Sequence, residues 1–428
     1  MKFRLLIIIY LSFNHLYADD NLNFYTKKAL ENNLQLKAER KNFETAKQNK
    51  NILRSEFLPS ITITGDQTSS TSTNRTDQSG SNLSDFNLDS ESKSVSLEQK
   101  IFTGFKGINT FKKTELETQK AKLTLILTEQ QTILDTAISY YDLIFKAKNE
   151  KFNISNVNLF ERQVEFDNAR VQKGEITLTD LAQSESSLAG ANAKLIKAKT
   201  ELSSSKTKFE RITGEKAPET NDLDETLILD LPNSLSSSLE TAKLKNIDLL
   251  ISKLDYEIAV KDFNIEKSRL SPSASINFSK TESKDFSSTV DEIDDETVKA
   301  TITWPLFKGG ENVSSIKKSL YEKQRAQFLL EDTKSKTASE TSNSWSNFQS
   351  SKGVLTATKA QLKAAEIANE GITLEYDSGN TRTTLEVIQS RSLLLEARID
   401  NAKAERDYLI SQFELAKQIG LLSLKTLN

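Results

Sequence analysis

A short corner motif occurs twice in this chain, each time between a strand-like run and a long stretch without proline. Residues 101–107 read IFTGFKG and follow the run SVSLEQK, and residues 306–310 read LFKGG and follow the run KATITWP. Gly104 and Gly309 align at an offset of 205 residues. Self-similarity at this spacing indicates a duplicated unit, so the fold must contain the same strand-to-helix connection twice. The glycines of the two corners are Gly104, Gly107, Gly309 and Gly310.

The duplication extends beyond the corners. The segment KGEITLTDLAQSESSL around Gly174 resembles SGNTRTTLEVIQSRSLL around Gly379, with one residue inserted before Glu386. Asp180 then falls on Glu386 at an offset of 206. Each half therefore reads as helix, strand, long loop, strand, long helix, turn and helix.

This order predicts the boundaries of the repeats. We expect a first structural repeat at 19–214, a linker at 215–233, a second repeat at 234–421 and a tail at 422–428. The first repeat holds strands at about 59–68 and 93–102 and helices at about 107–170 and 177–213. The second holds strands at about 272–280 and 297–306 and helices at about 311–376 and 382–420. Each repeat opens with a further helix.

The composition limits both where the protein can be located and which functions it can have. Residues 1–18 combine Lys2 and Arg4 with an apolar run at 5–11, the pattern of a secretory signal peptide. Its removal would leave 55 basic and 60 acidic residues, a net charge of −5, which argues against nucleic-acid binding. The chain has no Cys, and its single His is His15. The mature chain would lack the commonest general base and metal ligand, which argues against an enzyme.

The two long helices carry narrow apolar stripes. Both expected helices lack proline and would run roughly 95–100 Å at 1.5 Å per residue. In the first helix, large apolar side chains recur at the spacing of a coiled-coil seam. They are Leu116, Leu123, Leu127, Leu134, Ile138, Tyr141 and Phe145. Polar residues occupy the remaining faces. This predicts helices that make few contacts with their neighbours and are exposed to water on more than one side.

The four expected strands each alternate apolar and polar residues over about ten positions, the length of a tilted membrane-spanning β-strand. One strand alternates through Val95, Leu97 and Ile101, and another through Ile302, Trp304 and Leu306. Polar loops at 68–92 and 281–297 join the strands of each pair, as on the outer side of a membrane barrel. The alternative at this point is an ordinary antiparallel sheet with one solvent-exposed face.

Four strands cannot close a barrel, and an open sheet edge is not tolerated in lipid. If these strands span a membrane, several chains must therefore pool them. Because side chains fill an eight-stranded barrel, a conduit favours at least three chains. The helices are too long to cover one small sheet, so we expect them to continue away from it as a tube.

The sequence resembles the TolC-like outer-membrane efflux proteins. The resemblance rests on the doubled corners, KIFTGFKG and TWPLFKGG, and on the doubled segments GEITLTDLAQS and GNTRTTLEVIQS. It implies an α+β membrane protein and a homotrimer. Four transmembrane strands per chain would be pooled into a twelve-stranded barrel in the bacterial outer membrane, continued by a long periplasmic α-helical barrel. It also implies a passive exit duct without cofactors, which docks a periplasmic adaptor and an inner-membrane pump or secretion ATPase.

The resemblance further implies a gate at the periplasmic end. The positions that match the family's inter-helix polar links are Thr179, Asp180, Tyr376, Arg382 and Glu386. A bond between Arg382 and Asp180 would hold neighbouring helix pairs together. Three copies of Glu386 would form an acidic constriction that attracts cations, although a second acidic ring is replaced by Gln389. The ordinary alternative is a cluster of helix-starting residues.

The turns between the paired helices contain Gly174 and Gly379, and the resemblance implies that these tips bind the adaptor. An ordinary αα-hairpin is the alternative there. For the whole chain, the alternative function is a secreted coiled-coil scaffold without a pore. A carboxylate-based hydrolase is disfavoured because the sequence places no carboxylate pair in a recognisable pocket. Drug efflux and type I protein secretion both remain open.

Overall fold

A computed structural model describes residues 22–218, 229–287, 290–378 and 382–427. These form two compact units. The helical unit comprises the described residues within Met1–Lys37, Thr128–Ala242 and Ser339–Asn428, and the sheet unit comprises those within Ala38–Leu127 and Lys243–Ala338. The expected signal peptide at 1–18 and the hairpin residue Gly379 lie outside the described residues, as does most of the expected linker.

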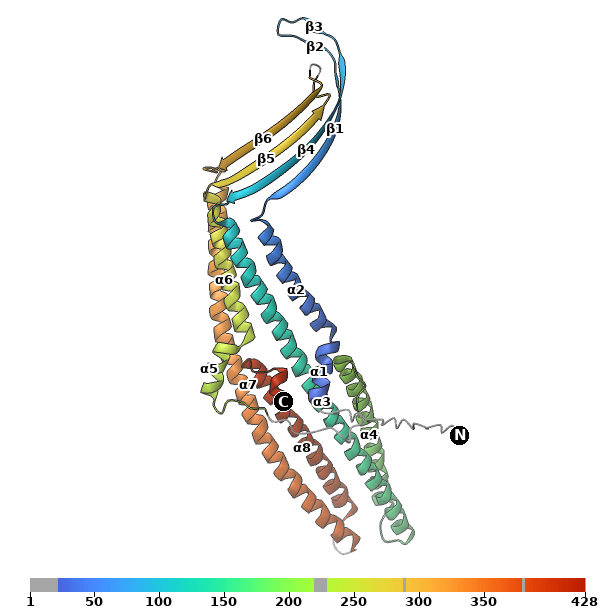
Figure 1. Ribbon diagram of the computed structural model, residues 1–428. Coiled ribbons are helices and arrows are strands. Elements are labelled where there is room, and N and C mark those ends of the chain that lie inside the picture. The colour runs from blue at the N-terminus through green and yellow to red at the C-terminus, as the bar shows by residue number, and fades with distance from the viewer. Residues whose placement is uncertain (1–21, 219–228, 288–289, 379–381, 428) are drawn as a thin grey trace, which may run out of the picture. The chain divides into compact units, whose positions relative to one another are not determined.

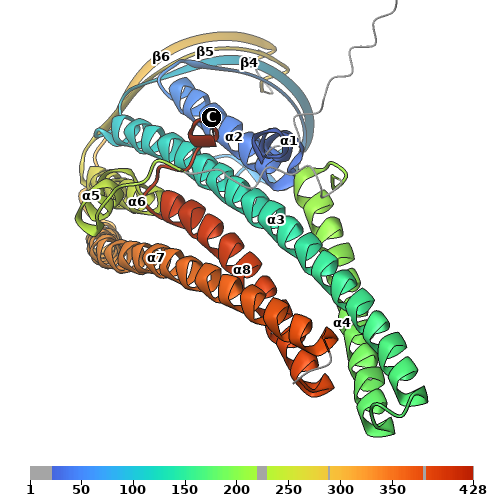
Figure 2. The ribbon, with the colours of Figure 1, turned by 90° about the horizontal axis from the view of Figure 1, so that it is seen from below.

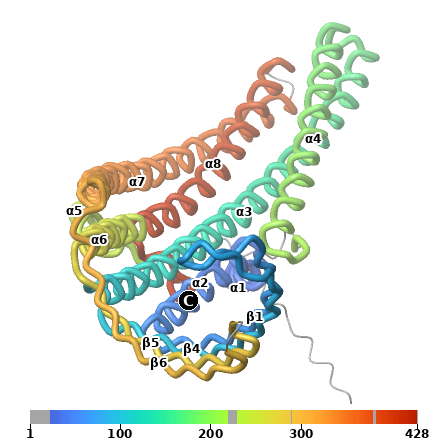
Figure 3. Tube along the Cα trace, turned by 90° about the horizontal axis from the view of Figure 1, so that it is seen from above, coloured from blue at the N-terminus to red at the C-terminus, as the bar shows by residue number. Residues whose placement is uncertain are grey.

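The sheet unit contains one antiparallel sheet of four strands. They are β1 (Ser60–Ser72), β4 (Phe86–Phe102), β5 (Ser273–Lys284) and β6 (Glu292–Thr303), in the spatial order β1-β4-β5-β6 (Figure 1). One hairpin comes from each repeat, and the two hairpins pair through β4 and β5. The strands bend into an arc when they are seen from above (Figure 3).

Three details of the sheet differ from the expectation. β4 is 17 residues long, because residues that were expected to form a loop pair with β1 as far as Ser72. A short ribbon, β2 (Arg75–Thr76) with β3 (Asn82–Leu83), lies within the same expected loop. β6 ends at Thr303, so the prediction that Trp304 and Leu306 continue the strand is wrong. Pro305 has no N–H for a ladder hydrogen bond, which explains this end.

Residues directly opposite one another form rows across one face of the sheet. Three rows of this face are mainly apolar: Phe102–Ala274–Ile302, Gln99–Ile276–Ala300 and Ile61–Leu97–Phe278–Val298. The next row is mixed, Ile63–Val95–Lys280–Glu296, and the following one is largely charged, Gly65–Lys93–Glu282–Asp294. The opposite face carries Ser, Thr, Asn, Lys and Glu, as in Thr62, Ser96, Ser279 and Thr297.

A β-bulge corrects the expected alternation of β4. The register shifts between Lys100, opposite Ser275, and Phe102, opposite Ala274. Ile101 is therefore the extra residue of a bulge, and Phe102 takes the place on the apolar face that was predicted for Ile101. Bulges increase the local twist of a strand, which suits the point where β4 turns into a helix.

Each strand-to-helix corner has two consecutive residues with left-handed backbone. Gly104 and Phe105 have φ of 64° and 66°, and the aligned Gly309 and Gly310 have φ of 55° and 83°. A side chain at Gly104 would meet Ser271, whereas nothing lies within 4 Å of a Cβ built on Gly309. Gly107 packs against the ring of Phe57. The duplicated motif therefore encodes a duplicated backbone turn.

The long helices of both repeats start at these corners. α3 spans Lys106–Gln172 and α7 spans Glu311–Asp377, 67 residues each. In the sheet unit they are accompanied by most of α2 (Leu34–Ser55) and by α6 (Ile247–Lys267), which precede β1 and β5. Ion pairs join α3 to these helices: Lys113 binds Asp262 at 2.8 Å, Lys120 binds Asp255 at 2.6 Å, and Lys50 binds Glu115 at 2.7 Å.

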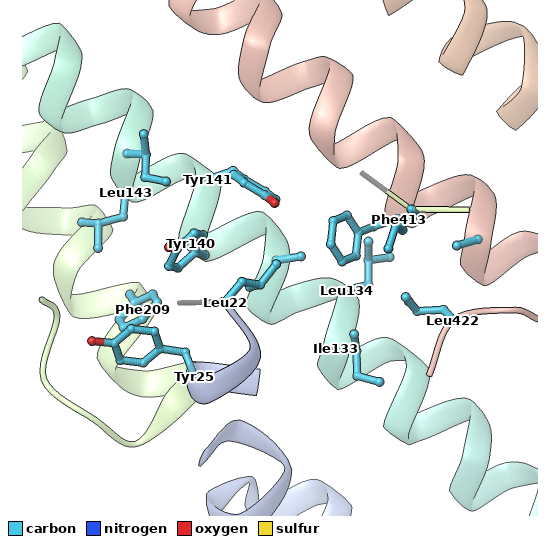
Figure 4. Close-up of a cluster of buried hydrophobic side chains, with 14 of the residues drawn as sticks. Leu22, Tyr25, Ile133, Leu134, Tyr140, Tyr141, Leu143, Phe209, Phe413 and Leu422 are labelled. Carbon is cyan, nitrogen blue, oxygen red and sulfur yellow. The ribbon is translucent and has the colours of Figure 1, made fainter. Parts of the chain in front are cut away.

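The helical unit holds the main apolar core. It contains α1 (Leu22–Asn32), α4 (Leu178–Thr213), most of α5 (Leu235–Lys245), α8 (Thr384–Gln418), the short helix η2 (Leu424–Leu427) and the later parts of α3 and α7. Figure 4 shows Tyr25 of α1 beside Phe209 of α4 and Tyr140 of α3. Phe413 of α8 and Leu422 complete the same cluster.

The predicted narrow seam is wrong for the middle of α3. Between residues 132 and 145 nearly every side chain is buried, including Thr136, Ser139 and Tyr140, which lie outside the expected stripe. α1, α4, α8 and the C-terminal segment cover α3 here (Figures 1 and 2). Small and hydroxyl-bearing residues on its other faces allow this close approach, because Thr and Ser bond their hydroxyls within the helix, as Thr136 does to Thr132 at 2.8 Å.

Two antiparallel hairpins, α3 with α4 and α7 with α8, make up the rest of the helical unit (Figure 2). α3 ends at a turn in which Gly174 has φ of 71°, and its N–H bonds the carbonyl of Val171 at 2.9 Å. Among the described residues, no helix combines the length and apolarity needed to cross a bilayer.

Candidate functional site at the hairpin ends

The helices that follow the two hairpin turns begin with the same capping arrangement. The Asp180 carboxylate accepts hydrogen bonds from the backbone N–H and hydroxyl of Thr177, at 3.0 and 2.8 Å. The Glu386 carboxylate does the same with Thr383, at 2.8 and 3.0 Å. Each threonine hydroxyl in turn accepts the N–H of its acid at 3.3 Å, which completes a capping box.

These bonds lower the pKa of both carboxyls. For Asp180, the Thr177 hydroxyl is the main cause, followed by the Thr177 N–H. For Glu386, the Thr383 N–H is the main cause, followed by the guanidinium of Arg382. Hydrogen bonds to the ionised carboxylate favour that form. The sequence pattern Thr-x-x-Asp/Glu is the signature of this cap, so both acids have a local structural role whatever else they do.

Arg382 lies in the second hairpin and binds within it. Its Nε donates to Glu375 at 2.6 Å, and its Nη1 donates to Glu386 at 3.0 Å. In this single chain, therefore, Arg382 and Asp180 are each held by their own hairpin, and the described residues form no bond between them. Thr179 is exposed on the first turn of α4.

Tyr376, near the end of α7, is buried and reaches the other hairpin. Its hydroxyl donates to Asp167 of α3 at 2.8 Å and lies 3.1 Å from the hydroxyl of Thr384 in α8. It also accepts from Gln163 Nε2 at 3.2 Å. Burial is the main cause that raises the pKa of Tyr376, so this hydroxyl stays neutral at ordinary pH and acts as a donor.

Asp167 is the centre of these contacts, and the sequence alone did not single it out. Its carboxylate is fully buried. It accepts from Ser184 of α4 at 2.5 Å, from Gln163 at 2.9 Å and from Tyr376. A signal was available: Gln163 and Asp167 are four residues apart, and both lie on the face of α3 that also buries Val157 and Phe160. Polar residues on a buried helix face indicate a specific partner.

Arg391 of α8 makes a second connection to α3. Its Nη1 donates to Gln163 Oε1 at 3.0 Å and to the carbonyl of Leu159 at 3.3 Å. Burial lowers the pKa of this guanidinium. We call Gln163, Asp167, Ser184, Tyr376, Thr384 and Arg391 the inter-hairpin cluster. It draws on all four helices of the two hairpins.

The inter-hairpin cluster is a hydrogen-bonded network that joins helices. The cluster has donors and an acceptor that satisfy one another, which rigidifies a buried network. The described residues contain no group of three or more acidic or histidine side chains placed to hold a metal ion. What the cluster does is hold the α3/α4 hairpin against the α7/α8 hairpin near their turn-bearing ends.

Comparison with protein families and curated proteins gives a consistent result. The family described as outer membrane efflux protein matches residues 26–215 and 239–421. Outer membrane protein TolC of Escherichia coli (strain K12) is 25% identical over 442 residues, which covers 99% of this chain and 87% of TolC. Outer membrane efflux protein BepC of Brucella suis is 22% identical, covering 92% of this chain and 84% of BepC.

Solved structures show the same fold. CusC superposes with a TM-score of 0.82 at 14% identity, covering 93% of this chain and 92% of CusC. The CmeC outer membrane channel of Campylobacter jejuni superposes with a TM-score of 0.82 at 15% identity, covering 94% of this chain and 86% of CmeC. The family match spans both repeats and most of the chain. The chain therefore belongs to the outer membrane efflux protein family, and it is an outer-membrane exit duct.

Proposed function

We propose that three copies of this chain form one passive duct that carries substrate from the periplasm to the exterior without a chemical step or a cofactor. The observation that carries this proposal is the order of the sheet, β1-β4-β5-β6. In the described chain, β1 and β6 each have a single partner in this sheet and so present an open edge. Lipid does not tolerate such an edge, which supports closure by further copies.

The two edges fit one another. β1 has 13 residues and β6 has 12. Because adjacent strands are antiparallel throughout the sheet, β1 and β6 run in opposite directions. β6 of one copy can therefore pair with β1 of the next in the same antiparallel pattern. Three copies would give twelve strands, enough for a conduit, whereas two would give a barrel filled by its own side chains.

We propose that the helical unit continues the duct into the periplasm and closes it at the hairpin ends. Arg382 is exposed and Asp180 is partly exposed, and we place a bond between them at the contact of hairpins from neighbouring copies. Glu386, repeated around the threefold axis, would form an acidic ring that attracts cations. Thr179, the neighbour of Asp180 in the sequence, would lie at the same contact.

The proposed position of the hairpin turns in the periplasm indicates which proteins would bind them. We propose that the hairpin turns at Gly174 and Gly379 contact a periplasmic adaptor, which links the duct to an inner-membrane pump or secretion ATPase. A secretion role is supported by the relative named alkaline protease secretion protein AprF of Pseudomonas aeruginosa, which is 21% identical over 405 residues. The efflux role is supported by the family match.

The experiment is to purify the mature chain in detergent, determine its mass by native mass spectrometry and insert it into planar bilayers. The proposal expects a trimer that conducts ions. A conducting dimer would contradict the twelve-stranded barrel. A monomer that stays soluble without detergent and never conducts would instead favour the scaffold function and overturn the duct.

A further inference from the structure

We propose that charged side chains on the polar face of the sheet make the barrel a charge filter, whose outer part passes cations more readily than anions. This inference rests on the proposed duct of three copies, in which the apolar face meets lipid and the polar face lines the passage. The filter is distinct from the acidic ring proposed for Glu386, because its residues belong to the sheet unit and Glu386 belongs to the helical unit.

The register of the strands assigns each charged side chain of the sheet to one of its two faces. Five successive rows of the polar face, counted outward from the strand-to-helix corners, contain all the charged residues of that face among the paired residues. They are Lys100–Ser275–Thr301, Ser60–Glu98–Asn277–Lys299, Thr62–Ser96–Ser279–Thr297, Thr64–Ser94–Thr281–Asp295 and Asp66–Ser92–Ser283–Ile293. The middle row has only Ser and Thr, so a neutral, hydroxyl-bearing row separates the charges into two groups.

The two groups have opposite sign. The two rows nearest the corners, which we call the inner rows, hold Lys100 and Lys299 with Glu98, a net charge of +1 per chain. The two rows farthest from the corners, the outer rows, hold Asp66 and Asp295, a net charge of −2 per chain. Rings of carboxylates favour cations in a pore, and rings of lysines favour anions. Three copies would therefore repeat an acidic group above a basic one around the passage.

The distance between the two groups lets each act on a passing ion separately. Asp295 and Lys299 are four residues apart on β6, which is about 13 Å along the strand. At a strand tilt near 40° this is about 10 Å along the barrel axis. The Debye length at physiological ionic strength is about 8 Å. The acidic and basic groups should therefore act in series rather than cancel each other.

The charges of the polar face lack partners, whereas most charges of the opposite face are paired. None of the ion pairs of the described residues involves a charged residue of the five polar rows. Three ion pairs lie on the opposite face: Lys93–Glu91 at 3.0 Å, Lys280–Glu282 at 3.5 Å and Lys284–Glu292 at 3.6 Å. Opposite charges that lie side by side largely cancel at a distance, because their Coulomb energies have opposite signs. The unpaired charges of the polar face should therefore dominate the field in the passage.

The test is the ratio of K⁺ to Cl⁻ permeability, obtained from the reversal potential of the trimer in planar bilayers under a KCl gradient near 0.1 M. Asp295→Asn removes one carboxylate per copy and should lower this ratio about 2-fold or more, as estimated for three charges roughly one Debye length from the ion. Lys299→Gln should raise the ratio by a similar factor. Both effects should shrink in 1 M KCl, where the Debye length is about 3 Å.

The matched control is Asp294→Asn. Asp294 adjoins Asp295 on β6 but belongs to the opposite face, in the row Gly65–Lys93–Glu282–Asp294. The control removes the same charge at nearly the same depth and should leave the permeability ratio unchanged. Both aspartates are exposed, so neither substitution should hinder assembly, and native mass spectrometry verifies that each variant is trimeric.

The outcomes separate the filter from the duct itself. A wild-type chain that does not conduct would refute the proposed duct. A conducting wild type whose permeability ratio is the same in Asp295→Asn and Lys299→Gln would refute the filter alone. Equal shifts in Asp294→Asn and Asp295→Asn would also overturn it, since selectivity would then not depend on the face of the sheet. Finally, Asp295→Asn should lower the ratio further in a Glu386→Gln background, and no further change there would show that the acidic ring alone sets selectivity.

Discussion

Alanine substitutions at the two aligned corner glycines should have unequal costs. Both Gly104 and Gly309 have left-handed backbone, which costs an L-residue about 1–2 kcal/mol. At Gly104 a Cβ would also lie 2.5 Å from the Cβ of Ser271 and 2.9 Å from the carbonyl oxygen of Ser268. Neither atom is the end of a flexible side chain, so overpacking should add about 1–3 kcal/mol. At Gly309 nothing lies within 4 Å.

The assay is thermal unfolding of the purified protein in detergent, followed by circular dichroism at a fixed scan rate. Gly104→Ala should lower the melting temperature clearly more than Gly309→Ala, which serves as the matched control because it carries the same backbone strain. The loss of unfolded-state entropy, about 0.4–1 kcal/mol for Gly to Ala, is common to both and cancels. Equal losses, or a larger loss at Gly309, would show that the contact with Ser271 does not determine the cost.

Three other measurements follow from the structure. Because the folded state lowers the pKa of Asp180 and Glu386, their capping contribution is present above the ordinary carboxyl pKa and is lost as the pH falls through the lowered values. The protection of the amides at the starts of α4 and α8, measured relative to their intrinsic exchange rates at each pH, should therefore fall only in acid, and protection that does not change with pH would contradict this. Glu386→Gln should weaken channel block by multivalent cations added on the periplasmic side, and equal block would remove the acidic ring. Phe209→Ala, in the core, should cost about 3–5 kcal/mol in the free energy of unfolding, whereas exposed Leu244→Ala should change it by less than about 0.5 kcal/mol; denaturant titration distinguishes the two.

Features encoded by local sequence were predictable. The left-handed turn at Gly104 and Gly309 could be expected because glycine adopts positive φ without strain. The capping boxes at Thr177 and Thr383 follow from a four-residue pattern. The alternation of apolar residues placed four strands, because a period of two is visible within a single strand.

Features that depend on distant contacts were not predictable in the same way. Asp167 and Tyr376 are 209 positions apart, and no pattern in either helix states that they meet. The bulge at Ile101 is visible only in the register with β5. The middle of α3 is buried on faces that a seam leaves open, because α1 and the C-terminal segment, remote in sequence, cover it. Interpreting Asp180 and Arg382 as partners likewise requires a neighbouring copy.

The rows of the sheet determine which part of this chain meets hydrocarbon. The apolar face extends over four residues of β6, from Val298 to Ile302, which is about 13 Å along the strand. At a strand tilt near 40°, this length corresponds to about 10 Å along the barrel axis. Barrels of the outer membrane present an apolar band about 25 Å tall. The missing depth can be supplied by the exposed Trp304, Leu306 and Phe307 after β6, where Phe307 is 85% exposed. In the proposed barrel, the hydrophobic band would therefore reach into the strand-to-helix corner as far as Phe307, and the largely charged row Gly65–Lys93–Glu282–Asp294 would lie at the level of the lipid headgroups.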